Sequence, residues 1–256
     1  MSKRRRFVIT SLLLCLGFVA VQFLNDQNRF WAIGALGILT VVLFYWSLME
    51  SLKGGLTLLT LVLPVIFTLG VGVFWFLLPA NIFARIPIVI FYGLGIYTLC
   101  LTANIYSVAS VRTIALLRAA RGVGFVLSLL TSFLVYDAIL STKSELYILI
   151  PFTLVVSFLL YLQGYWSMLL DAEHSKELFI LSGISSLLTA EVATVLFFWP
   201  VTVVVGSLFL TVTFYMLLGL GQAKLDGRLF ASVVREHLMV GALVFTAMFF
   251  ATHWGG

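Results

Sequence analysis

The feature that most constrains the fold of this chain is an almost unbroken apolar run of 44 residues, from Leu178 to Gly221. A membrane-spanning helix needs about 20 apolar residues to cross the hydrocarbon core of a bilayer. The run is therefore long enough for two spans, and the sequence Phe-Phe-Trp-Pro lies at its middle, at 197–200. Proline disfavours helix in the residue before it and suits the first turn of a helix. We predict two spans joined by a tight turn, with Trp199 at the membrane interface and Pro200 in the first turn of the second span.

Composition places the whole chain in the same class. Of the 256 residues, 62% are hydrophobic and only 10% are charged, and the mean hydropathy is +1.16. These values exclude a soluble globular protein. No polar segment is long enough to fold outside the membrane, so we expect a single membrane domain over residues 1–256. Cys15 and Cys100 both lie in apolar segments, which indicates neither a disulfide nor a metal site.

Short polar turns divide the chain into nine apolar segments, at 7–24, 30–48, 56–78, 87–108, 122–140, 146–170, the two halves of 178–221, and 238–254. The sequence thus predicts an all-α integral membrane protein, a polytopic bundle of about nine transmembrane helices. The first segment follows a basic start, for which a secretory signal peptide is the alternative. Its length and the lack of a clear cleavage site favour an uncleaved helix. Pro64 predicts a kink in the third span, and Pro87 is expected to begin the fourth.

The distribution of basic residues predicts the orientation. With the N-terminus in the cytoplasm, twelve of the fifteen Lys and Arg residues fall in inside segments, and three fall outside, namely Arg29, Arg85 and Lys143. Cytoplasmic loops of membrane proteins carry this excess of positive charge. We therefore predict a cytoplasmic N-terminus, an external C-terminus and residence in the plasma or inner membrane. No basic stripe interleaved with aromatic residues is present, so the net charge of +5 does not indicate nucleic-acid binding.

An internal repeat is a second hypothesis about organisation. A shift of 116 residues aligns residues 30–140 with residues 146–254 and brings Arg112 onto Arg228. The aligned spans have the same orientation, so the repeat would be parallel, as in some transporters. Identities are sparse, and apolar helices of similar length align by chance, which is the alternative.

Glu191 is the acidic residue that is hardest to place outside the membrane. It precedes Trp199 by eight residues, which is about 12 Å along a helix axis. A carboxylate in hydrocarbon is costly unless it is protonated, paired or facing a polar cavity, so such a residue is a functional hypothesis by default. Arg85 and His253 are the external charges that we consider as partners. The alternatives are a structural hydrogen bond and a protonated acid near the outer interface.

The same span carries a stripe of hydroxyl groups at helical spacing, made of Ser182, Ser185, Ser186 and Thr189. At about 100° per residue, Glu191 points about 200° away from Thr189. The glutamate and the stripe are therefore expected to face different neighbours. Packing against another helix is the simplest role for the stripe.

Other polar residues lie near the inner side. Asn104, in the fourth span, lines a polar path or forms an interhelical hydrogen bond, and the second role is the more typical. Arg112, Arg118 and Arg121 precede the fifth span. They are candidates for contact with anionic lipid head groups or a partner protein, and the alternative is that they only set the topology.

Catalytic and cofactor patterns are absent from the sequence. The three histidines, His174, His237 and His253, are isolated, and none has metal-site spacing or lies deep enough in a span to bind haem. There is no aspartate pair for Mg²⁺, no Gly-x-Ser-x-Gly nucleophile and no lysine inside a span. We therefore expect no enzyme and no cofactor.

Two classes of function remain. One is a membrane-embedded accessory or scaffold protein, or a subunit of a complex or homo-oligomer, that contacts membrane lipids and other membrane subunits. The other is a small transporter or lipid-handling protein that uses Glu191 as an intramembrane carboxylate.

Overall fold

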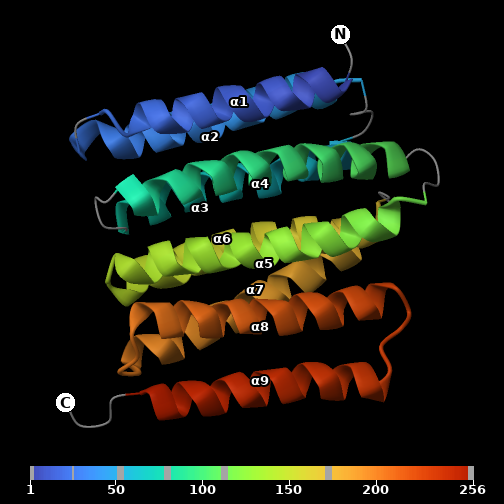
Figure 1. The fold of residues 1–256 in the computed structure, drawn as a ribbon. Coiled ribbons are helices and arrows are strands. Elements are labelled where there is room, and N and C mark those ends of the chain that lie inside the picture. The colour runs from blue at the N-terminus through green and yellow to red at the C-terminus, as the bar shows by residue number, and fades with distance from the viewer. Residues whose placement is uncertain are drawn as a thin grey trace. The chain divides into compact units, whose positions relative to one another are not determined.

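The computed structural model describes residues 3–24, 26–50, 55–77, 82–110, 115–170 and 175–252. Within these ranges the chain forms nine α-helices and two 3₁₀ segments, with no strand (Figure 1). Eight of the described helical segments are long and apolar enough to cross a membrane. The fold is the all-α, multi-pass membrane bundle that the apolar segments predict.

The chain divides into two compact units, Met1–Leu127 and Ser128–Gly256. The helix α5 (Leu117–Ser141) contributes its first part to one unit and the remainder to the other. The expectation of a single membrane domain, with a repeat of residues 30–140 and 146–254, stays a prediction.

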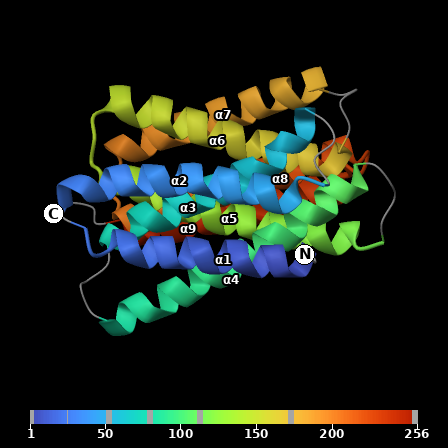
Figure 2. The ribbon, with the colours of Figure 1, turned by 90° about the horizontal axis from the view of Figure 1, so that it is seen from above.

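The first unit contains α1 (Lys3–Val21), α2 (Asp26–Leu48), α3 (Val62–Phe74) and α4 (Ile82–Ala109). The 3₁₀ segments η1 (Gly55–Leu61) and η2 (Trp75–Leu77) flank α3. The helix α1 packs against α2 and α4 (Figure 2). The Tyr92 ring lies at the centre, 4.7 Å from the Phe18 ring and 6.0 Å from the Phe67 ring.

The helix α1 is the one described helix that falls outside the eight candidate spans. Its first turn consists of basic residues, and Arg6 forms an ion pair with Glu50 after the end of α2. The apolar part that follows buries Phe7, Leu14 and Phe18. The expectation of an uncleaved first helix stays a prediction.

The second unit contains the end of α5 together with α6 (Leu146–Leu169), α7 (Ser175–Phe198), α8 (Val203–Leu225) and α9 (Ala231–Ala251). The helices α6 and α7 lie side by side (Figure 2), and α8 packs against both. The helix α9 packs against α8 and, among its described residues, buries only Met248.

One expectation about proline was wrong. Pro87 lies inside α4, because that helix begins five residues earlier, at Ile82. Pro64 lies near the start of α3, which begins at Val62 directly after the 3₁₀ segment η1. The kink expected at Pro64 stays a prediction.

The expected turn at Trp199 is present but longer than predicted. The N–H of Trp199 donates to the Leu196 carbonyl at 3.2 Å, and Thr202 caps α8 by accepting from the N–H of Val205 at 3.4 Å. Pro200 therefore precedes α8. The sequence had suggested that Pro200 lies in the first turn of this helix.

Several helices also extend into charged sequence. Lys224 belongs to α8, His237 belongs to α9, and Arg118 and Arg121 belong to α5. A helix satisfies its own backbone groups and can continue beyond the apolar core, so a charge does not mark its end.

Candidate functional site

The hydroxyl stripe of α7 faces α6. The Ser185 and Thr189 side chains are buried, and their hydroxyl groups lie 2.8 Å from the Tyr165 hydroxyl and 2.9 Å from the Tyr161 hydroxyl. Ser182 and Ser186 are buried on the same side. The stripe therefore packs α7 against α6, which is the role that its spacing predicts.

Glu191 lies on a different face of α7 and has an exposed side chain. Within the described part of the chain it forms no hydrogen bond or ion pair. Pairing with either partner considered from the sequence stays a prediction: Arg85 belongs to the first unit, where its guanidinium lies 5.2 Å from the centre of the Trp75 ring, and His253 lies outside the described residues. Glu191 is thus a carboxylate on the surface of a membrane-spanning helix.

This surface is one wall of a groove between α7, α8 and α9. Two adjoining hollows of about 570 Å³ and 240 Å³ form the groove, and four residues line both, namely Glu191, Val192, Phe209 and Phe245. Glu191 is the one charged side chain among the described residues that line them. Apart from Glu191 and Thr213, the residues that line the groove are apolar. The groove is therefore an apolar surface that contains a single acidic group.

The groove exists because α9 packs closely against α8 and does not cover the face of α7 that carries Glu191. Gly219 of α8 has no Cβ, and the space is filled by the His237 ring, which stacks on the Tyr215 ring at 5.1 Å. Gly241 of α9 accommodates Met216 in the same way. Small residues allow such close approach of helices in membranes.

Trp199 closes one end of the groove. Its indole N–H donates to the Thr252 hydroxyl at 2.9 Å, and its ring meets the edge of the Phe245 ring at 6.0 Å. The turn before α8 is therefore tied to the end of α9, and the groove is open along its side.

The sequence reasoning missed a second intramembrane carboxylate, Asp137. Its side chain is 4% exposed, and its Oδ1 accepts a hydrogen bond from the Ser207 hydroxyl at 3.2 Å. The same hydroxyl lies 3.0 Å from the Val204 carbonyl, so one hydrogen serves two acceptors. Asp137 was not selected as a candidate from the sequence, although the apolar segment 122–140 contains it and α5 extends to Ser141. Its place inside an apolar segment was the signal that could have found it.

The remaining sequence candidates do not join these carboxylates. Asn104 is half-buried in α4 of the first unit and has an interaction partner. Arg118 is exposed in the first turn of α5, and Arg121 is half-buried and also has a partner. Arg112 lies outside the described residues. Lipid contact by these arginines stays a prediction.

A family match covers most of the chain. A family model matches residues 48–251, from the last residue of α2 to the last residue of α9. The chain belongs to the family described as protein of unknown function DUF5656. Both intramembrane carboxylates, Asp137 and Glu191, lie inside the matched region. No curated protein and no solved structure matches the chain.

Proposed function

We propose that this multi-pass membrane protein is a non-enzymatic scaffold or complex subunit, and that it binds a transmembrane helix of a partner in the groove between α7, α8 and α9. The observation that carries this proposal is the exposed Glu191 carboxylate, which has no partner among the described residues and stands in an otherwise apolar groove.

The depth of Glu191 determines which occupants fit. The residue lies about 12 Å along α7 from Trp199, at a depth where lipids present acyl chains and not head groups. Acyl chains have no hydrogen-bond donor, so they leave the carboxylate unsatisfied at a cost of several kcal/mol. A partner helix with a Lys, Arg or amide side chain at this depth supplies the missing donor, and polar side chains join transmembrane helices in this way.

The length of the groove also fits a helix. On α7 its lining extends from Leu188 to Leu196, which is about 12 Å at 1.5 Å per residue, or about two turns of a partner helix. The partner is a separate membrane subunit or a second copy of this chain. The excess of basic residues in inside segments supports the plasma or inner membrane as its location, with a cytoplasmic N-terminus.

The open side of the groove favours docking over transport. A small transporter or lipid-handling protein that used Glu191 would hold it in an enclosed, polar pathway. The apolar lining around an exposed carboxylate is a surface for another helix instead.

Photocrosslinking in native membranes tests this function. A photoreactive residue at Val192, in the groove, is expected to give an adduct with one defined membrane protein or with a second copy of the chain. Ile184 is the matched control, because it is 52% exposed on the same helix and does not line the groove. The adduct at Val192 should disappear in Glu191→Leu and persist in part in Glu191→Gln, which keeps hydrogen bonding. Equal adducts at both positions, or an adduct that survives Glu191→Leu, would refute the proposal.

A further inference from the structure

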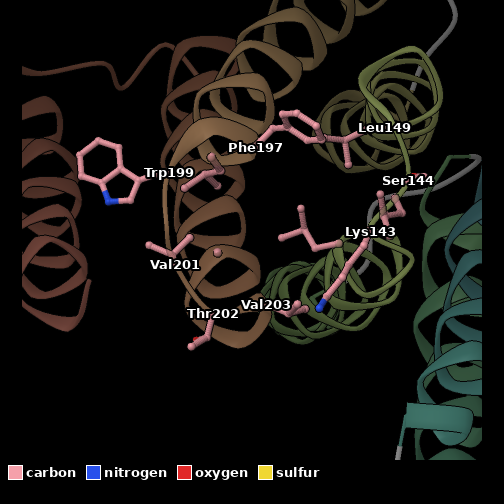
Figure 3. A pocket seen from close by; sticks show the side chains of 12 residues that line it. Lys143, Ser144, Leu149, Phe197, Trp199, Val201, Thr202 and Val203 are labelled. Atoms are coloured by element: carbon pink, nitrogen blue, oxygen red, sulfur yellow. The ribbon is translucent and has the colours of Figure 1, made fainter. Parts of the chain in front are cut away.

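A third hollow in the second unit lies where α5 ends and α8 begins, and it shares Leu196 and Trp199 with one end of the groove. It has a volume of about 240 Å³, and Figure 3 shows the side chains around it. Its apolar walls come from four helices and include Leu140 of α5, Leu149 of α6, Phe197 of α7 and Val203 of α8. Its polar groups come from the turns between those helices. The hollow therefore has apolar walls and polar residues at its opening.

Lys143 is the one charged side chain among the described residues that line this pocket. It has a φ of 46° in the turn after α5, and its side chain extends across the pocket toward Val203 at the start of α8 (Figure 3). Among the described residues Lys143 has no ion-pair partner, although Glu145 is close in sequence. Its positive charge is therefore available to a ligand.

Two hydroxyl groups also line the pocket. Ser144 lines it from the same turn as Lys143, and its hydroxyl lies 2.9 Å from that of Thr142, which itself donates to the Ile139 carbonyl at 2.7 Å. The hydrogen of the Ser144 hydroxyl is therefore used on Thr142. Thr202 lines the pocket from the turn before α8, and its oxygen accepts from the N–H of Val205, which leaves its hydroxyl hydrogen free to donate. One cation and one hydroxyl donor suit an acceptor-rich anion such as a phosphate.

The position of the pocket indicates where its phosphate comes from. Trp199 lines the same pocket, and tryptophan is enriched at the level of the lipid head groups. The apolar walls of the pocket are suited to the part of an acyl chain that lies next to the head group. We propose that this pocket binds the phosphate of an anionic membrane phospholipid, with the ammonium group of Lys143 on the phosphate and the first carbons of the acyl chain against Leu149 and Phe197. This site does not depend on the docking groove.

Lipid binding to the purified protein tests the site. Native mass spectrometry would measure the affinity for phosphatidylglycerol, with phosphatidylcholine as the neutral comparison. Lys143→Gln is expected to weaken phosphatidylglycerol binding about five-fold, since a basic side chain near such a head group contributes on the order of 1 kcal/mol. Lys224→Gln is the matched control. Lys224 is an exposed lysine in the last turn of α8, whereas the pocket lies at the first turn of that helix. It should bind as the wild type does.

A second variant separates the pocket from simple surface charge. Val203→Phe keeps Lys143 and fills the hollow, so it should also weaken binding. Thermal unfolding of each variant shows whether it is folded. Unchanged affinity in Lys143→Gln or in folded Val203→Phe would overturn the proposal, as would equal binding of phosphatidylcholine. Displacement of phosphatidylglycerol by millimolar inorganic phosphate would show that the ligand is free phosphate and not a lipid.

Discussion

Asp137 and Glu191 lie in the membrane-spanning helices of the second unit, and their surroundings differ. Asp137 is buried and accepts a hydrogen bond from Ser207, whereas Glu191 is exposed in the groove and has no partner among the described residues. The free energy of unfolding should therefore depend on the surroundings of Asp137 much more than on Glu191.

Removing the Ser207 hydroxyl should destabilise the second unit. Ser207→Ala leaves the Asp137 carboxyl buried without its donor, which costs about 1–3 kcal/mol. The double variant Ser207→Ala with Asp137→Leu removes both polar groups and should recover most of that loss, because replacing both partners by apolar groups is nearly neutral. Thermal unfolding in detergent measures both. If Ser207→Ala is as stable as the wild type, the hydrogen bond contributes nothing and the role assigned to it is wrong.

Substitution of Glu191 should leave the isolated chain stable. Because the side chain is exposed and forms no ion pair within the described residues, Glu191→Gln and Glu191→Leu should each change the free energy of unfolding by less than about 0.5 kcal/mol. The measurement is chemical or thermal unfolding of the purified protein. A loss of several kcal/mol would instead reveal a buried ion pair, as with the partners considered from the sequence.

At the level of helices, the contact between α8 and α9 depends on glycine. A Cβ at Gly219 would overlap the His237 ring, which Tyr215 holds in place by stacking. Close packing of this kind leaves little room for an added methyl group.

Gly219→Ala should therefore weaken the attachment of α9. Overpacking of a tight contact costs about 1–3 kcal/mol, and the thermal midpoint should fall accordingly. Gly183→Ala on α7 is the matched control, since a Cβ there has nothing within 4 Å and alanine favours a helix. A midpoint that falls equally for both variants would show that the effect is not specific to the contact with α9.

For the whole molecule, the predicted topology assigns each end of each helix to one side of the membrane. In the first unit, Arg6 pairs with Glu50, which places the start of α1 and the end of α2 at one end. In the second unit, Lys143 and Trp199 line one pocket, and Trp199 bonds to Thr252. The topology predicted from the basic residues places Arg6 and Glu50 together on the inside, and Lys143, Trp199 and Thr252 together toward the outside.

Nine crossings with a cytoplasmic N-terminus remain the prediction for the topology. Reporter fusions after Lys53 and Lys176 should report the cytoplasm, and fusions after Lys143 and at the C-terminus should report the outside. A cytoplasmic C-terminus would contradict nine crossings. The apolar part of α1 is short, because the helix begins with basic residues. A fusion between α1 and α2 is therefore the control that shows whether α1 itself crosses the membrane.

The sequence by itself determined the class of the protein and most of its helices. A span must be apolar over about 20 residues and must satisfy its own backbone groups, and both requirements are local. The hydroxyl stripe on α7 and the different direction of Glu191 were predictable for the same reason, since helical spacing alone sets which residues share a face.

Tertiary structure decided the surroundings of each polar group. Asp137 is buried because its face of α5 meets Ser207, which lies 70 residues further along the chain. Glu191 is exposed because α9 packs on α8 through Gly219 and Gly241 and leaves the neighbouring face of α7 open. These helices carry apolar residues on all sides, so hydropathy does not distinguish the face that meets a helix from the face that meets lipid. Only side-chain packing between helices distant in sequence separates a buried carboxyl from an exposed one.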